Sequence, residues 1–163
     1  MKLTRILKVS EKEFYDYLEN DLLHNIYQCT DKKLSVKDIK KGLNYTKHEN
    51  DALVRIDVSI LDYKRGEFFK SKIKSMADAI TISYETEVVS EGLKVVFNQY
   101  LESFENSKQN KFMRLFSEAV YFGRMSDTLY DLQKKIINQR EGIVEPSIPE
   151  PIAHKQIKKL FSK

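Results

Sequence analysis

The sequence predicts one α+β domain in which a curved antiparallel sheet of five to seven strands packs on a long C-terminal helix. Apolar side chains recur every three or four residues over 11–28 and again over 107–139, which is the spacing of one helix face. Between these segments, over residues 43–101, apolar and polar residues alternate as they do in half-buried strands. Short turn sequences separate the alternating runs, which indicates an antiparallel meander.

The chain opens with a strand followed by a helix. The segment 2–9 is short and rich in Leu, Ile, Thr and Val, which is typical of a strand. Ser10 and Glu13 have the spacing of a capping box, so we expect the first helix to begin directly after Ser10 and to run to about residue 28. A second, shorter helix is expected over 35–42, with Ser35 as its cap and Gly42 as its left-handed end.

The alternating region divides into strands at its turn sequences. We expect strands at 43–48 and 52–63, another around Phe69 to Ile73, and two more at 80–88 and 93–101. Together with the strand at 2–9, these strands give a sheet of at least five. A break in the alternation near Met76 could divide the chain once more and bring the sheet to six or seven strands. In each run the even or odd positions carry the apolar side chains, so one face of the sheet is expected to be buried.

The final helix is expected to begin at a cap formed by Asn106 or Ser107 and to reach about Gln139. At ~1.5 Å per residue such a helix spans on the order of 45 Å, enough to cross a small domain. Gly123 lies in its middle, where glycine costs about 1 kcal/mol relative to alanine. The glycine indicates a bend or, alternatively, the close approach of a backbone or ligand.

Residues 1–140 are expected to form the domain, and residues 141–163 a proline-containing linker and a basic tail. The prolines of Glu145–Pro151 exclude a helix there. The tail, His154–Lys163, is basic and mildly amphipathic, so it could touch an anionic membrane or a partner's groove. A frayed terminus, or one docked on its own domain, is the alternative.

Composition excludes several classes of protein. The chain of 163 residues suits one core, and without an apolar run of ~18 residues no membrane span is expected. The single cysteine, Cys29, excludes an internal disulfide and favours a reducing, cytoplasmic compartment. The net charge of +4 is spread among 24 acidic residues, which does not indicate nucleic-acid binding. The apolar N-terminal block of a secretion signal is also absent from the sequence.

The predicted order of strand, two helices, meander and long last helix resembles the START-like superfamily, also called helix-grip or SRPBCC. Met1–Ser10, Glu13–Leu18, Lys40–Tyr45 and Thr81–Glu85 also resemble a domain-of-unknown-function family of small proteins from Gram-positive bacteria. The likeness covers about 140 residues loosely. It implies a helix-grip fold in which the sheet and the last helix enclose an apolar cavity for a small hydrophobic molecule. The proline linker and the tail lie outside that pattern.

The expected inward rows contain polar or amphipathic exceptions that suit a small-molecule pocket. These candidate pocket residues are Tyr45, Ser71, Tyr84, Thr86 and Gln99 in the sheet, with Phe122 and Met125 on the last helix. The alternative is that the tyrosines are core residues whose hydroxyls reach the surface.

Catalytic and metal-binding motifs are not found. His24, His48 and His154 lack the spacing of metal ligands, and Asp16 and Glu19 are expected on a solvated helix face. No cofactor is therefore expected. The leading hypothesis is a non-enzymatic module that binds a small hydrophobic or amphipathic ligand. The alternative is a structural or interaction domain that acts through its surface, its tail or a homodimer interface, and a START-like enzyme comes third.

Overall fold

The computed structural model describes residues 1–49, 54–107 and 111–143, so the proline linker and the tail fall almost entirely outside the described residues. The helical elements are α1, α2, α3 and a 3₁₀ turn, η1. Their bounds are α1 Glu11–Thr30, η1 Val36–Asp38, α2 Glu102–Glu105 and α3 Lys111–Arg140. The strands are β1 Lys2–Leu7, β2 Asn44–Glu49, β3 Val54–Lys64, β4 Phe68–Lys74, β5 Ala79–Val89 and β6 Gly92–Leu101.

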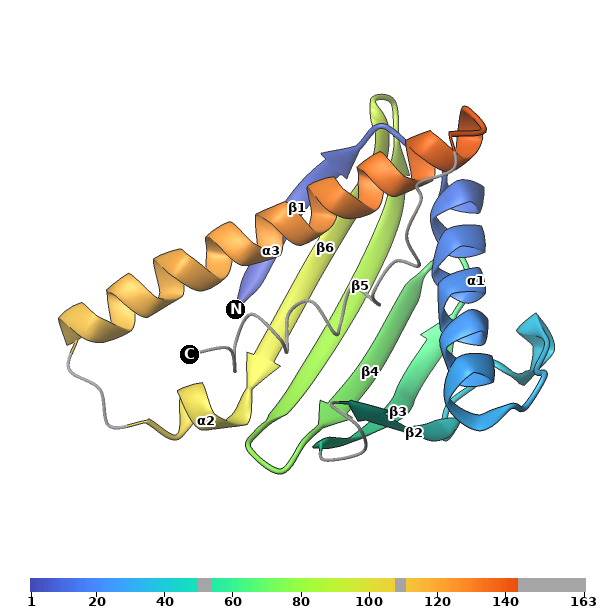
Figure 1. Ribbon diagram of the computed structural model, residues 1–163. Helices are drawn as coiled ribbons and strands as arrows, with labels where there is room; N and C mark the ends of the chain where they lie inside the picture. Colours follow the sequence, from blue (N-terminus) through green and yellow to red (C-terminus); the bar gives the residue numbers. More distant parts are fainter. Residues whose placement is uncertain (50–53, 108–110, 144–163) are drawn as a thin grey trace.

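These six strands form one antiparallel sheet in the order β1-β6-β5-β4-β3-β2. The first strand therefore pairs with the last, and β2 to β6 follow one another as a meander. Both long helices, α1 and α3, lie across the same face of the curved sheet (Figure 1). We call that face the inner face and the opposite one the outer face. The predicted fold class, including the long C-terminal helix, is confirmed.

The start of α1 has the predicted capping box. The backbone N–H of Ser10 donates to Glu13 Oε2 over 2.8 Å, and the Glu13 N–H donates to Ser10 Oγ over 3.2 Å. Each side chain thus satisfies a backbone donor that the first helical turn leaves unpaired. The expected second helix over 35–42 is reduced to η1, because the Asp38 carboxylate accepts the Ser35 N–H and closes a tight local turn.

The final helix begins later than the sequence predicted. Asn106 ends the short helix α2 instead of opening α3, and α3 starts at Lys111. From there α3 continues as one helix through Gly123. A Cβ added at Gly123 would meet nothing within 4 Å, so no described backbone outside the helix approaches it closely, and the alternative of a close backbone approach was wrong.

Only the second half of α3 packs on the sheet. Its inward residues are completely or almost completely buried: Met125, Leu129, Leu132 and Ile136. The first half projects past the end of the sheet (Figure 1). Phe112 and Leu115, expected to belong to the same buried stripe, are 75% and 66% exposed because no described part of the sheet lies beneath them.

Candidate functional site

Two neighbouring cross-strand rows on the inner face carry the candidate residues of the sheet. In one row Phe69, Tyr84 and Phe97 stand directly opposite one another on β4, β5 and β6. In the next row Ser71 and Gln99 flank Ile82. Ser71 and Gln99 are each 3% exposed, which is unusual for polar side chains. The inner face thus combines an aromatic row with two buried polar groups.

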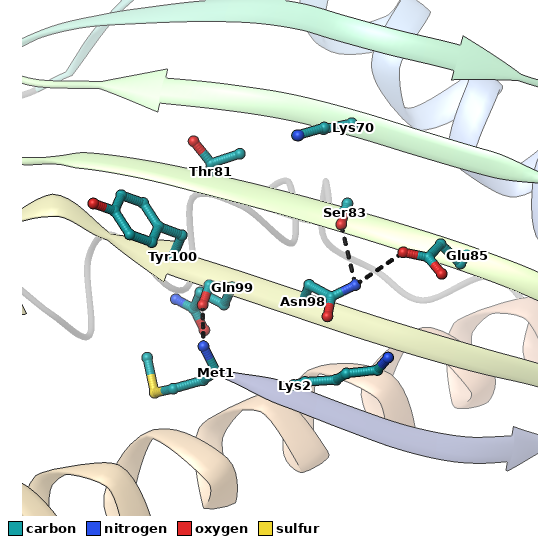
Figure 2. Close-up of a pocket in the computed structure, with 9 residues that line it drawn as sticks. All are labelled: Met1, Lys2, Lys70, Thr81, Ser83, Glu85, Asn98, Gln99 and Tyr100. Atoms are coloured by element: carbon teal, nitrogen blue, oxygen red, sulfur yellow. Dashed lines mark hydrogen bonds between the residues drawn. The ribbon is translucent and has the colours of Figure 1, made fainter. Parts of the chain in front are cut away.

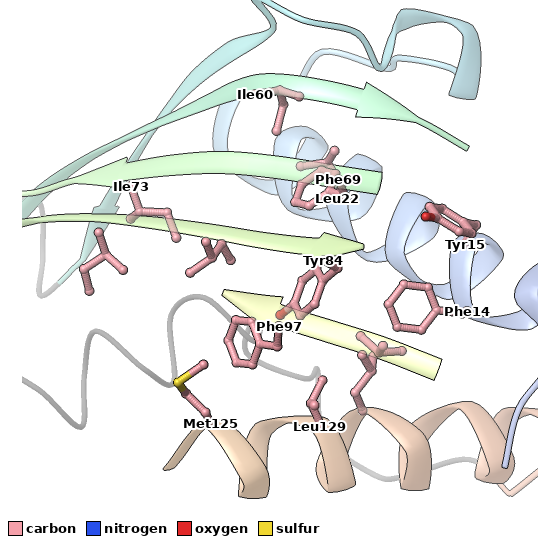
Figure 3. Close-up of a cluster of buried hydrophobic side chains, with 14 of the residues drawn as sticks. Phe14, Tyr15, Leu22, Ile60, Phe69, Ile73, Tyr84, Phe97, Met125 and Leu129 are labelled. Carbon is pink, nitrogen blue, oxygen red and sulfur yellow. The ribbon is translucent and has the colours of Figure 1, made fainter. Parts of the chain in front are cut away.

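Tyr84 lies at the centre of the aromatic row (Figure 3). Its ring stacks on Phe97 with centroids 4.9 Å apart, on Phe69 at 6.5 Å, and meets the edge of Phe14 from α1 at 6.0 Å. The hydroxyl is buried and has no hydrogen-bond partner among the described residues. Burial raises the pKa of this phenol. A buried polar group without a partner costs about 1–3 kcal/mol, so its retention calls for an explanation.

Met125 closes this region from α3 and is completely buried (Figure 3). Phe122, the other helix residue expected to line the pocket, is 36% exposed. Phe122 points within about 20° of Leu129, which is completely buried, so its exposure comes from its place one turn before Met125, toward the half of α3 that projects past the sheet. The structure therefore brings Met125, but not Phe122, to Tyr84 and its neighbours.

Thr86, a further pocket candidate, makes two hydrogen bonds within the fold through its hydroxyl. Its Oγ1 donates to the carbonyl of Gly66 over 3.1 Å. The same oxygen lies 2.9 Å from the hydroxyl of Tyr15, which must be the donor because the Thr86 proton is already given to the carbonyl. This chain of bonds ties α1 to the β3–β4 turn. Thr86 is thus placed as a structural link.

Tyr45 and Asp21 add further polar groups on the inner side of the sheet. Tyr45 stands opposite Val58 on the inner face of β2 and is half-buried, and desolvation raises the pKa of its phenol. Asp21 on α1 is half-buried, and desolvation raises the pKa of its carboxyl to about 6, against the attraction of Lys135 and His24. The negative charge of Asp21 acts on both Tyr45 and Tyr84. A carboxyl and two phenols therefore lie within electrostatic range of one another.

Glu19 is buried, at 3% exposure, and the expectation that it is solvated was wrong. Its carboxylate accepts hydrogen bonds from the hydroxyl of Tyr63 and the guanidinium of Arg65. A shift of register between Ile60 and Asp62 lets Tyr63 face the core. The alternation in the sequence could not show this bulge. The cluster joins α1 to β3 and its turn, and every charge in it is paired.

A separate hollow lies on the outer face, with a volume of about 560 Å³ (Figure 2). It is lined by Met1, Lys2, Lys70, Thr81, Ser83, Glu85, Asn98, Gln99 and Tyr100. Lys70, Ser83, Asn98 and Lys2 form one cross-strand row within it. Asn98 Nδ2 donates to Glu85 Oε1 over 3.3 Å and lies 3.4 Å from Ser83 Oγ. Of the predicted pocket residues only Gln99 borders this hollow, so it is not the expected inner cavity.

Metal and membrane sites were also sought in the described residues. No group of three or more His, Cys, Asp or Glu side chains there could hold a metal ion. No helix in the described part of the chain is long and apolar enough to cross a membrane.

A family model described as "Domain of unknown function (DUF3284)" matches residues 1–120. The chain belongs to this family. The match covers all six strands, both shorter helical elements, α1 and the exposed first part of α3. It agrees with the resemblance of the opening residues to a family of unknown function. A comparison with curated proteins gives no match.

Several solved structures resemble this DUF3284 protein in fold. SA2116 from Staphylococcus aureus, a protein of unknown function, is 16% identical with a TM-score of 0.56, covering 87% of this chain and 94% of that one. Ara h 8.0201 is 7% identical with a TM-score of 0.56, covering 85% and 97%. The Aha1 dimer from Colwellia psychrerythraea is 15% identical with a TM-score of 0.52, covering 83% and 94%. At these identities the likeness shows the helix-grip fold alone.

Proposed function

We propose that this DUF3284 protein is a non-enzymatic module that binds a small hydrophobic or amphipathic molecule against the inner face of the sheet. The observation that carries the proposal is the buried hydroxyl of Tyr84, which has no hydrogen-bond partner among the described residues. A ligand oxygen or nitrogen at that hydroxyl would supply the missing hydrogen bond. The helix-grip fold supports the proposal, since the superfamily it resembles commonly holds apolar molecules between sheet and last helix.

The neighbouring side chains suit an amphipathic ligand. Phe97 and Met125 offer apolar and polarizable surface for a carbon skeleton. Ser71, Gln99 and Tyr84 offer the few polar groups that fix the orientation of a ligand in a mostly apolar site. Asp21 and Tyr45 lie within electrostatic range of one another on the same side of the sheet and are best suited to a donor group on the ligand.

The test uses two buried tyrosines that differ in their partners. Tyr84→Phe removes a hydroxyl without a described partner, whereas Tyr15→Phe removes one that bonds to Thr86. We expect Tyr84→Phe to weaken saturable binding of 1-anilinonaphthalene-8-sulfonate by about tenfold and to stabilise the free protein by up to about 3 kcal/mol, because it removes an unsatisfied buried hydroxyl. Tyr15→Phe should lower stability and leave binding unchanged.

Native mass spectrometry of the protein purified from its own host provides the second arm. A co-purifying small molecule that is lost from Tyr84→Phe would name the ligand class. A protein that carries no molecule and binds the probe equally well with and without the Tyr84 hydroxyl would sink the proposal.

A second candidate function, an interaction domain, is favoured by a different observation. The first half of α3 exposes large apolar side chains, among them Phe112 and Phe116, outside the sheet. The exposed fractions are 75% and 61%, which is high for phenylalanine.

A further inference from the structure

Several exposed apolar or small residues of α3 lie on one side of the helix. We call this side the α3 outer stripe: Phe112, Phe116, Ala119, Val120 and Gly123. Successive residues of a helix turn by about 100°, so Phe116 and Met125, nine residues apart, point in opposite directions. Met125 is completely buried toward the sheet, and Phe116 is 61% exposed. The α3 outer stripe therefore faces away from the domain.

The stripe exposes a large apolar area for one helix face. Phe112 and Phe116 are 75% and 61% exposed, and Val120 is 39% exposed. With ~200 Å² for a whole phenylalanine side chain, these three expose on the order of 300 Å². That is within the range of the largest apolar patch on a typical monomer, which is often functional, and is more than a third of the ~800 Å² that each partner buries in a stable complex.

The shape of the stripe is self-complementary. Bulky Phe116 lies near one end, and two small residues, Ala119 and Gly123, lie one and two turns further on. The space above Gly123 is open, since a Cβ there would meet no atom within 4 Å. In an antiparallel pair that sets Ala119 against Val120 of the partner subunit, Phe116 lies over Gly123 of the partner subunit. We call the open space above Gly123 the glycine notch. The notch of each subunit thus receives Phe116 of the partner subunit, and the contact occurs twice, as two-fold symmetry requires.

We propose that the α3 outer stripe is the contact surface for a second copy of this chain, with two α3 helices antiparallel and each Phe116 seated over the glycine notch of the other. The inference deepens the interaction-domain candidate and does not depend on ligand binding at Tyr84. It assigns that candidate a partner, a surface and a geometry.

The charges beside the stripe favour a protein partner of mixed charge. Arg114 lies 3.4 Å from both Glu105 and Glu118, and Arg124 lies over the ring of Tyr121 at 5.9 Å. A membrane-bound helix would instead carry a row of cations beside its apolar face.

The decisive variant is Gly123→Leu in the full chain. Leucine is a better helix former than glycine and meets no described atom at this position, so the folded monomer should gain stability. The same side chain fills the notch, so the dimer should dissociate at a concentration at least tenfold higher. Sedimentation equilibrium measures the dimer, and urea unfolding measures the stability. If Gly123 has only a structural role, Gly123→Leu will change the stability and leave dimer formation unchanged.

Two further variants complete the test. Phe116→Glu should abolish the dimer and leave the circular dichroism spectrum intact, because the side chain is exposed. Tyr27→Glu on α1, with 47% exposure, is the matched control and should leave the dimer unchanged. A wild-type chain that stays monomeric at several hundred micromolar overturns the proposal, as does a Gly123→Leu dimer of wild-type strength.

Other occupants of the stripe would give different results, and each would also overturn the proposal. If deletion of residues 144–163 speeds hydrogen exchange over Phe112–Phe122, the tail covers the stripe. Binding of a monomer to phosphatidylserine vesicles that is lost in Phe116→Glu would show a lipid surface instead. Neither result bears on the Tyr84 test, so the two proposals fail separately.

Discussion

The guanidinium of Arg140, in the last turn of α3, holds the carboxylate of Glu13, in the first turn of α1. Arg140 Nε lies 2.5 Å from Glu13 Oε1, and the second nitrogen, Nη2, lies 2.9 Å from Oε2. Glu13 is also the capping-box residue of α1. One carboxylate therefore closes the start of the first helix and fastens the end of the last one to it.

This pair predicts a defined loss of stability in acid. The Arg140 hydrogen bond, with that of the Ser10 backbone, lowers the pKa of Glu13 from 4.5 to about 2. Because the folded-state pKa is depressed, the contribution is present above pH 4.5 and is lost as the pH falls toward 2. Both side chains are partly exposed, so we expect Arg140→Gln to cost only about 0.5–1 kcal/mol at pH 7.

Urea unfolding at pH 7 and pH 3 checks the Glu13 prediction. The cost of Arg140→Gln should be smaller at pH 3 than at pH 7. Arg55→Gln, which removes a surface pair with Asp57, is the matched control and should cost less at pH 7. An Arg140→Gln cost that is the same at both pH values would contradict the assignment.

For Asp21 we expect the stability of the fold to depend on pH in the opposite direction. Desolvation raises the pKa of its carboxyl from 3.8 to about 6, so between these values the folded state holds a proton that the unfolded state releases. Stability from this group therefore falls as the pH rises through that window. We expect Asp21→Asn to stabilise the protein at pH 7 by at most about 3 kcal/mol and to give no such gain near pH 3.5. Urea unfolding of the variant at both pH values, with His24 and Lys135 unchanged, measures the difference.

The two halves of α3 predict unequal responses to truncation of leucine. Leu129 is completely buried on the sheet, whereas Leu115 is 66% exposed. We expect Leu129→Ala to cost about 2–4 kcal/mol through the cavity it leaves. Leu115→Ala should cost less than about 0.5 kcal/mol in the dilute monomer. Chemical denaturation at low micromolar concentration tests the pair, and equal costs would mean that the first half of the helix also packs on the domain.

At Gly92, in the turn between β5 and β6, we expect any side chain to be strongly destabilising. A Cβ there would lie 2.2 Å from the carbonyl oxygen of Leu7 in β1, and the residue has a φ of +141°. Both facts exclude a side chain without movement of the β1–β6 pairing. We expect Gly92→Ala to lower the free energy of unfolding by at least about 2 kcal/mol. Gly66→Ala is a useful comparison, since there the nearest atom is the flexible Glu11 carboxylate at 3.0 Å.

Local rules were sufficient to predict much of this fold. The Ser10–Glu13 box marks the start of α1 by residue types alone, and the alternation of strands such as β6 reflects a single buried face. The bulge after Ile60 was not predictable in this way, because it changes which residues face inward without changing their chemistry. Tyr63, which follows the bulge, is one of the two partners of the buried Glu19 carboxylate.

The candidate site was harder to foresee. Phe122 and Met125 have the same apolar character, and only the direction in which α3 crosses the sheet decides that one is exposed and the other buried. Similarly, the open hollow at Lys70 and Asn98 comes from the outer row, where alternation predicts only solvated side chains. The exposure of a helix residue and the shape of a surface hollow depend on how whole helices and strands pack together. The spacing of residues within one helix or strand does not predict that packing.

The pairing of β1 with β6 has a consequence for how the chain folds. The two strands are about ninety residues apart, so β1 leaves the ribosome before almost the whole meander is synthesised, and only then can it pair with β6, its neighbour in the described sheet. Contacts between such distant segments slow folding and prolong the time that partly formed chains spend exposed. A nascent or truncated chain that ends before Gly92 carries β1 with both edges bare and leaves the meander open at β5. Such fragments are the form of this protein most in need of a chaperone.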